Sequence, residues 1–497
     1  MLAFIQLDST SPELIERLIG EGRMPVLSEL RRRGSWRRLE GSTDLFEAGV
    51  YPAIHSGVET ADHGLYYPLI WSPEGQRLRY MDRFSTPELV WERLSAAGAR
   101  CLVIDPYQLW EGPIASGVSF SGWQFRHRII PSWSQPGREW LRAVRRFGRP
   151  PLLVDVAGSR SPAELTRMRN VFVAGPGRVA DLFTDLLGRH SFDFAWVSLI
   201  STHLAGHHLW DLSQLRRGKL SPQDRARLET GLADVYSAAD AALGRMLERL
   251  PAGADLIVLS PLGMGPNTTR SDLLPRMVNC ILSGADSNGG DPGGDPVWRD
   301  RARLPSGLRH AFNRALPGPV VRDTLARMYT RRFDWSRTRA FNLPGDHFGN
   351  LRFNVRGRER DGIVDAAEVD ALAEEIASGL LSFSDEEGAE TVAAVHRPQV
   401  ELQGARVEQL PDLVVRWSDR PSTRLRAVVS PTFGRVSRRD AGVGRPGNHW
   451  PGAWLLIVPG RSRELDHGEA PQIIDLAATA AALVGPESAL PGRPLFG

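Results

Sequence analysis

Two histidines on one face of a predicted helix are the first residues in this sequence that could do chemistry. His203 and His207 are four positions apart, a spacing that puts both side chains on the same helix face about one turn apart. Neutral imidazole is a common ligand of Zn²⁺, so the pair could bind a metal ion. Pairs at this spacing also occur without metal. The pair alone therefore leaves a metal site and two structural histidines as alternatives.

Short apolar runs separated by helical patterns predict the elements that would position these histidines. In the helical segments, apolar residues recur at the spacing of one helix face. Strands that alternate with helices indicate a mostly parallel sheet covered on both faces. The predicted strands are Leu2–Leu7, Cys101–Ile104, Phe192–Ile200, Asp255–Ser260, Asp412–Trp417 and Trp454–Val458, and the helical segments include Pro12–Ile19, Asp224–Leu250 and Val369–Leu380.

The carboxyl ends of three predicted strands carry polar or turn-forming residues. In open α/β sheets, ligands bind beyond the carboxyl ends of the strands. This rule selects Asp8, the segment Ser201–His208 and the segment Ser260–Gly265. We expect the chemistry to lie where these strand ends meet.

Composition excludes several classes of protein. Among the 497 residues, 42% are hydrophobic, 24% are charged and the net charge is +3, which argues against a nucleic-acid-binding protein. Cys101 and Cys280 are the only cysteines, so a disulfide framework and a thiolate metal cluster are both excluded. No apolar segment approaches the ~20 residues of a membrane span, and the N-terminal apolar run is too short for a signal peptide. We therefore expect a cytoplasmic protein without a membrane partner.

Two segments read as insertions into one domain that spans residues 1–497. Residues 284–340 begin with a run of Gly, Asp and Pro that cannot pack a core, which is typical of a flexible surface loop. Residues 66–150 are rich in Trp, Arg and Pro and are a possible cap over the site.

Seven ordered segments along the chain resemble one known family. They resemble the type I phosphodiesterase/nucleotide pyrophosphatase family of the alkaline phosphatase superfamily. The resemblance implies an α/β/α sandwich with a mostly parallel central sheet and with loop or cap insertions. The matching segments are Leu7–Leu30, Tyr51–Tyr66, His203–His207, Asp255–Pro266, Gly349–Glu359, Gly447–His449 and Ile474–Thr479.

The sequence departs from this family at the residues that bind its two metals. A typical member has two metals held by Asp and His and a Ser or Thr nucleophile. Here the nucleophile position falls on Glu47, and the Asp of the family's D-x-x-G-H segment is His203. The Asp-His of its S-D-H-G-M segment is Pro261-Leu262, and neither of these side chains can bind a metal. The resemblance therefore implies that one metal site is lost.

The other metal site is rebuilt according to the same resemblance. His207 and His449 match family ligands, and His203 stands where a carboxylate stood. Three imidazoles form a suitable open site for one divalent metal, Zn²⁺ above all, with a further position for water or substrate. Asp8 and Glu47 would lie nearby as catalytic carboxylates, either as a general base or to orient a ligand. The site would then activate water or substrate with one metal.

Two functions follow from this altered site. The first is a metal-dependent hydrolase or related transfer enzyme that acts on a small anionic substrate such as a phosphodiester, a phosphonate or an activated ester. A biosynthetic pathway is one setting that fits such an enzyme. His347 and Arg352 are its candidate substrate-binding residues, although His347 could instead be a turn residue. The alternative is a non-catalytic descendant that keeps the pocket for binding or assembly.

Overall fold

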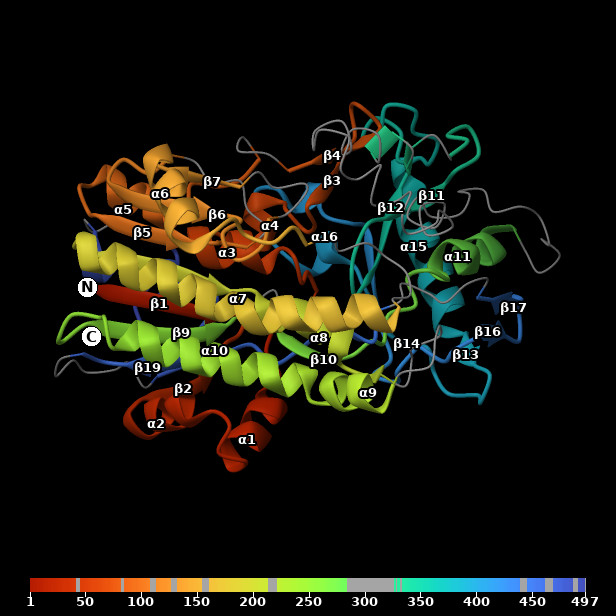
Figure 1. The fold of residues 1–497 in the computed structure, drawn as a ribbon. Helices are drawn as coiled ribbons and strands as arrows, with labels where there is room; N and C mark the ends of the chain where they lie inside the picture. The colour runs from red at the N-terminus through yellow and green to blue at the C-terminus, as the bar shows by residue number, and fades with distance from the viewer. Residues whose placement is uncertain are drawn as a thin grey trace.

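A central sheet of eight strands runs through the larger part of the molecule (Figure 1). In the computed structural model, the described residues are 1–41, 45–81, 85–107, 113–126, 132–153, 161–212, 221–283, 326–327, 329–330, 333–438, 445–460, 468–485 and 490–496. The strands lie side by side in the order β2 (Ser35–Arg38), β19 (Trp454–Val458), β9 (Asp255–Ser260), β1 (Leu2–Leu7), β8 (Phe194–Leu199), β5 (Cys101–Ile104), β6 (Gly117–Ser121) and β7 (Trp133–Gln135).

The middle of this sheet is parallel and its edges are antiparallel. β1 pairs in parallel with β8 on one side and with β9 on the other, and β5 and β6 continue the parallel order beyond β8. β19, β2 and β7 run antiparallel to their neighbours. The central strands are buried along their whole length, as parallel strands covered on both faces must be. The predicted mostly parallel sheet is confirmed.

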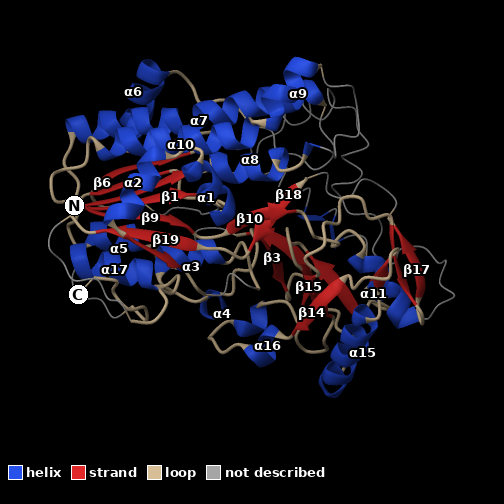
Figure 2. Ribbon diagram, turned by 90° about the horizontal axis from the view of Figure 1, so that it is seen from below, coloured by secondary structure: helices blue, strands red, loops and turns tan. Residues whose placement is uncertain are grey.

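Helices cover both faces of the sheet, so the architecture has three layers (Figure 2). Alternate residues of β1 point to opposite faces: Ala3, Ile5 and Leu7 contribute to one core, and Leu2 and Phe4 to the other. The first core is closed by α1 (Pro12–Gly20), α2 (Pro25–Arg33), α6 (Gly137–Phe147), α7 (Pro162–Arg189) and α10 (Gly231–Leu247). The second is closed by α3 (Val50–Ser56), α5 (Val90–Ala96) and α17 (Asp475–Val484).

A second, smaller sheet lies beyond the central one and has its own core. Its strands are antiparallel, in the order β11 (Ala340–Leu343), β12 (Gly349–Phe353), β15 (Leu413–Trp417) and β14 (Val392–His396). α11 (Leu274–Ser283) and α15 (Val369–Leu381) pack on it. Beside it lie β13 (Ser384–Asp385), β16 (Ala427–Ser430) and β17 (Gly434–Ser437). The sequence predicts the strand at Asp412–Trp417 but not this separate sheet.

Short elements connect these units. Two antiparallel pairs are the hairpin of β3 (Leu69–Ser72) with β4 (Arg77–Tyr80), and β10 (Gly263–Pro266) with β18 (Gly447–Trp450), which are distant in sequence. Further helices in the described part of the chain are α4 (Thr60–His63), α8 (Ser201–Leu209), α9 (Pro222–Glu229), α16 (Pro398–Glu401) and the 3₁₀ turns η3 (Ala366–Glu368) and η4 (Val407–Gln409). The single helical pattern predicted over Asp224–Leu250 forms two helices, α9 and α10, which meet at Thr230.

The structure describes most of the predicted insertion 66–150 and little of the predicted insertion 284–340. Within residues 66–150, β5, β6 and β7 belong to the central sheet, and among the described elements of this range the β3–β4 pair lies apart from it. Residues 284–325, the main part of the predicted insertion 284–340, lie outside the described residues. No helix in the described part of the chain is long and apolar enough to cross a membrane.

Candidate functional site

The buried carboxylate of Asp8 stands directly after β1 at the carboxyl end of the central sheet. Its Oδ1 accepts hydrogen bonds from Nε2 of Gln6 at 2.9 Å and from the hydroxyl of Tyr51 at 3.0 Å. Its Oδ2 lies 2.8 Å from Nδ1 of His203. Both carboxylate oxygens therefore have partners within the protein. Of the two roles that the sequence leaves open for Asp8, this geometry favours orienting a ligand over acting as a general base.

α8 brings His203 and His207 to the same place, immediately after β8. Both side chains are buried, and Thr202 fixes the start of the helix by donating from its hydroxyl to the carbonyl oxygen of Asp8 at 2.6 Å. The Nε2 atoms of the two histidines face each other at 3.0 Å. Nδ1 of His207 lies 3.0 Å from the carbonyl oxygen of Gly447.

His449 joins this pair from β18, a strand far away in the sequence. β18 runs against α8 so closely that a Cβ on Gly447 would lie 2.1 Å from the carbonyl oxygen of Gly206. A side chain at position 447 would therefore displace the strand. The three imidazole rings have centroids 4.7 to 5.0 Å apart, and one ring nitrogen from each lies within 4.8 Å of the others. No other such group of three His, Cys, Asp or Glu side chains occurs among the described residues.

The hydrogen-bond partners determine where the protons of His203 and His207 lie. A carbonyl oxygen can only accept, so Nδ1 of His207 carries a proton towards Gly447. The Asp8 carboxylate likewise accepts from Nδ1 of His203. In the neutral rings, two Nε2 lone pairs then face each other at 3.0 Å. Such an arrangement is stable only with a positive charge between the nitrogens, which is either a proton on one ring or a metal ion.

The three histidines fit a divalent cation of the zinc type. Burial is the largest cause that holds the pKa of His207 and that of His449 well below the usual range, and the nearby charge of Arg445 adds to it. Both rings are therefore neutral, the form that binds metal. Nδ1 of His449 is buried without a hydrogen-bond partner in the described structure. The 3.0 Å separation of the two Nε2 atoms is close to the ~3.3 Å edge of a tetrahedron with Zn–N bonds of ~2.0–2.1 Å.

The carboxyl end of β9, on the other side of β1, is apolar. Pro261 and Leu262 follow this strand, and Leu262 is buried in the core that α3, α5 and α17 close. In the same core, His55 packs against the rings of Trp91 and Trp196, and its ring nitrogens have no hydrogen-bond partner among the described residues. Burial lowers the pKa of His55 to about 3, so this ring is neutral. The carboxyl end of β9 is thus packed as hydrophobic core.

Glu47 lies just before α3 and is buried. Its Oε1 accepts hydrogen bonds from the backbone N–H groups of Asp346 at 2.9 Å and His347 at 2.8 Å. Burial raises its pKa to about 7, and the nearby charge of Asp346 adds to the rise. The amide of Asn448, the neighbour of His449, donates to the carbonyl oxygen of Asp346 at 3.1 Å. One loop thus links Glu47 to the strand that carries His449.

His347 and Arg352 occupy different surroundings. His347 is buried on the loop that holds Glu47, and burial lowers its pKa to about 4. Arg352 lies in β12 of the second sheet, where Nε donates to Glu359 at 2.9 Å and Nη1 donates to the carbonyl oxygens of Glu408 and Leu410. Arg352 is 1% exposed. The structure therefore gives Arg352 the contacts of a buried ion pair and does not bring it to the histidines.

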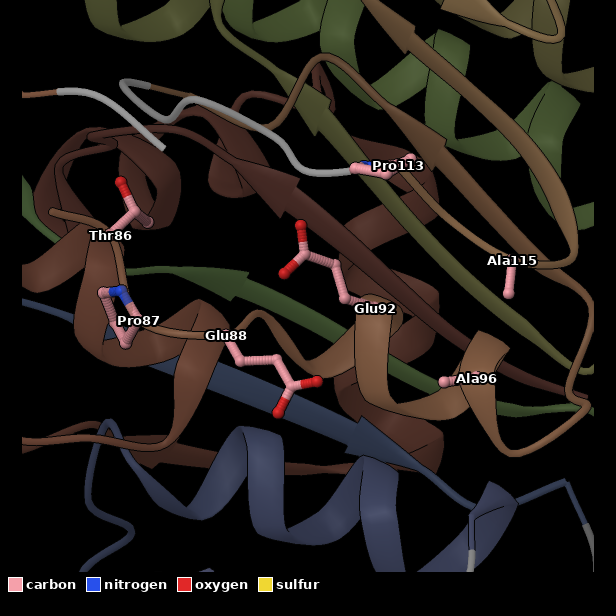
Figure 3. Close-up of a pocket in the computed structure, with 7 residues that line it drawn as sticks. All are labelled: Thr86, Pro87, Glu88, Glu92, Ala96, Pro113 and Ala115. Carbon is pink, nitrogen blue, oxygen red and sulfur yellow. The ribbon is translucent and has the colours of Figure 1, made fainter. Parts of the chain in front are cut away.

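A surface pocket of about 400 Å³ lies elsewhere, over α5 (Figure 3). Its lining includes two carboxylates that are already used within the protein. Glu92 accepts from the backbone N–H of Leu89 at the start of α5, and Glu88 pairs with Arg93 at 3.0 Å. None of the residues singled out in the sequence lines this pocket.

Comparison with known proteins rests on solved structures. No protein-family model and no curated protein sequence matches the chain. The phosphonoacetate hydrolase from Sinorhizobium meliloti 1021, solved with phosphonoacetate, aligns with a TM-score of 0.51 over 97% of this chain and 95% of that one, at 14% sequence identity. The chain has an alkaline-phosphatase-like fold. The predicted fold class is confirmed by this match and by the sheet order.

A second solved structure covers the full length of this chain. Murine ectonucleotide pyrophosphatase/phosphodiesterase 5, an inactive variant in complex with AMP, aligns over 100% of this chain and 99% of that one. Its TM-score is 0.45 and its sequence identity is 11%.

The sequence reasoning missed the groups that surround the histidines. Tyr51 lies within a segment that carries the family resemblance, yet only the fold shows its hydroxyl on Asp8. Gln6 is inside a predicted strand, where it would ordinarily be read as an isolated polar residue in a core. Tyr107 follows β5, and its ring packs edge-on against that of His203 at 4.8 Å. The contacts of Tyr51 and Tyr107 join different elements of the fold, so no local pattern signals them.

Proposed function

We propose that the chain is a metal-dependent hydrolase, or a related transfer enzyme, that uses one divalent ion held by His203, His207 and His449. Zn²⁺ suits three imidazole ligands best. When bound, such an ion supplies Lewis-acid polarisation and activation of water at neutral pH. Asp8 serves as the positioning residue for this site because it holds Nδ1 of His203 and directs Nε2 towards the ion.

The facing Nε2 atoms of His203 and His207 carry this proposal. Their separation is 3.0 Å, while the Nδ1 atom of each ring is directed at an acceptor, Asp8 or the Gly447 carbonyl. Histidines buried only for packing need not aim two lone pairs at one point. The lowered pKa values of His207 and His449 keep these two rings neutral, so that their lone pairs are available to a metal ion.

Glu47 is the proposed proton-transfer group. General acid–base catalysis is most effective when the pKa of the group lies near the working pH, and burial raises the pKa of Glu47 to about 7. The loop that fixes its carboxylate also contacts Asn448 beside His449. We infer that Glu47 exchanges a proton with the attacking or leaving group of the substrate.

The proposed substrate is a small molecule with an anionic centre. The phosphonoacetate hydrolase that shares the fold was solved with such a molecule. Two-metal displacement needs both ions to stabilise attacking and leaving oxygens. A one-metal site therefore favours a reaction other than ordinary nucleotide pyrophosphate cleavage.

The alternative, a non-catalytic protein that keeps the pocket for binding, is favoured by the apolar residues Pro261 and Leu262. Elemental analysis of the chain, purified without a metal-binding tag, separates the two functions. A hydrolase of the proposed kind holds about one zinc, iron or manganese ion per chain and loses it in His207→Ala. Absence of metal, even after metal is added back, would favour the non-catalytic function.

A further inference from the structure

α6 turns a basic face to the solvent. Its opposite side packs against the core beneath it, with Ala143 buried and Trp140 and Phe147 partly buried. One exposed leucine, 62% exposed, lies among four exposed arginines on the outer side. This outer side, here called the α6 face, consists of Arg138, Leu141, Arg142, Arg145 and Arg146. Three of its arginines follow the i, i+4, i+7 spacing that places side chains along one stripe of a helix.

The carboxylates that pair with the α6 face lie beneath it. Glu139 pairs with two of the arginines, and Asp185 of α7 pairs with a third. The side chains of Glu139 and Asp185 are only 2% and 5% exposed, and both also pair with Arg189. Arg145 has no ion-pair partner in the described part of the chain. The buried carboxylates therefore leave a positive charge on the surface that meets the solvent.

The segment that contains α15 has the opposite charge. Residues 361–396 include ten Asp or Glu and neither Lys nor Arg. α15 buries one side on the second sheet and exposes Asp370, Glu374 and Leu381 on the other, here called the α15 face. Asp370 and Glu375 pair with arginines of neighbouring segments, whereas Glu374 has no ion-pair partner among the described residues. Leu381 is 51% exposed, so this acidic face also has an apolar side chain.

α6 and α15 lie toward opposite ends of the molecule in both views (Figures 1 and 2). The α6 face therefore cannot meet the α15 face of its own chain. The two helices have 11 and 13 residues, so they are about 16 Å and about 20 Å long and can lie along each other. An anionic membrane or a nucleic acid would engage the basic face alone. A second copy of the chain is the partner that matches both faces at once.

We propose that the α6 face of one copy docks on the α15 face of a second copy, so that the chain associates head to tail. The inference goes beyond the proposed function and does not depend on it. Opposite charges set the register of the two helices, and contact between Leu141 and Leu381 removes apolar surface from water. The contact is heterologous, so further copies add at both ends unless a ring closes. It is also small and charged, so the association is weak and sensitive to salt.

Sedimentation velocity of the full chain over a concentration series tests this contact. The mean sedimentation coefficient should rise with protein concentration at low salt. It should return to the value of a single chain in about 1 M salt, where charges more than ~3 Å apart are largely screened. A basic-face variant, Arg138→Glu with Arg145→Glu, should raise the dissociation constant more than about tenfold, because attraction becomes repulsion. An acidic-face variant, Asp370→Arg with Glu374→Arg, should have the same effect.

A mixture of the two variants makes the test specific to a head-to-tail contact. Each variant alone should remain a single chain. In an equal mixture, the intact α15 face of the basic-face variant meets the intact α6 face of the acidic-face variant, so association should return. The matched control is Arg17→Glu with Arg32→Glu, which reverses the charge of two arginines, 65% and 73% exposed, on α1 and α2. It changes the net charge by as much as the basic-face variant does and should associate as the unmodified chain does.

Several results would overturn the proposal. They are an unmodified chain that stays single at low salt, association that persists in either charge-reversal variant, and a mixture that does not associate. Should a charge-reversal variant fail to fold, the neutral change Arg138→Gln with Arg145→Gln replaces it. That change should weaken association several-fold because it removes attraction without adding repulsion, and unchanged association in it would also overturn the proposal.

Discussion

The carboxyl ends of β8 and β9 lie on opposite sides of β1, yet they have opposite character. β8 leads into α8, which carries His203 and His207, whereas β9 leads into Pro261 and Leu262. Asp8, at the end of the strand between them, turns its Oδ2 to His203 and receives Tyr51 and Gln6 on Oδ1. The end of β8 thus carries a cluster of buried histidines, whereas the end of β9 is packed as hydrophobic core. The two strand ends that flank Asp8 can therefore differ completely in chemistry within one sheet.

Zinc binding at the carboxyl end of β8 should depend on the three histidines His203, His207 and His449. His203→Ala removes one of three proposed ligands and should lower zinc affinity by more than ~100-fold, beyond the 10–100-fold typical of changes in the groups that support ligands. Circular dichroism should show the fold retained. His396→Ala, at a histidine that pairs with Glu401 nearer the surface, is the matched control and should leave zinc content unchanged. Full zinc retention in His203→Ala would refute the ligand set.

Leu262, at the carboxyl end of β9, should contribute to the stability of the fold by packing and should not affect zinc binding. Leu262 is 3% exposed, so Leu262→Ala should lower the free energy of unfolding by about 2–5 kcal/mol through the lost contacts and the cavity left behind. The zinc affinity of this variant should equal that of the unmodified chain within experimental error. Leu381→Ala, at a leucine that is 51% exposed, should change stability little. A variant at Leu262 that lost zinc while keeping its stability would show that this side still belongs to the site.

Glu47 should make the stability of the chain depend on pH. The folded chain keeps the proton of Glu47 up to about pH 7, whereas the unfolded chain releases it near the ordinary value of 4.5. Between pH 4.5 and about pH 7 the folded state binds more protons than the unfolded state. The free energy of unfolding therefore falls as the pH rises through this range, and the contribution of Glu47 no longer changes above it. Glu47→Gln should therefore gain up to about 3 kcal/mol relative to the unmodified chain at pH 8 and nothing at pH 4.

Chemical denaturation at several pH values measures this difference. Glu374→Gln, at an exposed position of α15, is the control and should track the unmodified chain at every pH. If the difference between Glu47→Gln and the unmodified chain were the same at pH 4 and pH 8, burial would not be raising the pKa of Glu47.

The smallest effect should come from the Tyr51 hydroxyl. Tyr51→Phe removes one of the two donors to Oδ1 of Asp8, and a hydrogen bond to a charged group is worth about 1.5 kcal/mol, so zinc affinity should fall about tenfold. Tyr66→Phe removes a buried hydroxyl that has no hydrogen-bond partner among the described residues, and zinc affinity should not change. Equal effects of the two changes would mean that Asp8 does not act through Tyr51.

Much of the fold follows from the sequence, because apolar runs predict buried strands locally. Leu2–Leu7, Cys101–Ile104, Asp255–Ser260 and Trp454–Val458 are strands with the predicted bounds. The apolar pattern does not show, however, which strands pair with each other. The sequence predicts a strand at Asp412–Trp417, but the apolar run itself does not show that β15 pairs with β12 and β14 in a separate antiparallel sheet.

A residue of the candidate site can be predicted when it belongs to a segment that resembles the family. It cannot be predicted when only the contacts of the folded chain determine its surroundings. His449 lies far from His203 and His207 in the sequence, and the family resemblance selects it before any geometry is known. Arg352 shows the opposite case. A lone arginine in a strand pattern gives no sign that Glu359 and two carbonyl oxygens will engage its guanidinium. Ion pairing of that kind is decided by the contacts between elements.

The most direct test of the one-metal site is a crystal structure of the zinc-loaded chain with anomalous data collected at the zinc absorption edge. We expect one anomalous peak, ~2.0–2.1 Å from ring nitrogens of His203, His207 and His449, with Asp8 still hydrogen-bonded to Nδ1 of His203. A peak at the end of β9, two peaks, or no peak between the three histidines would contradict it.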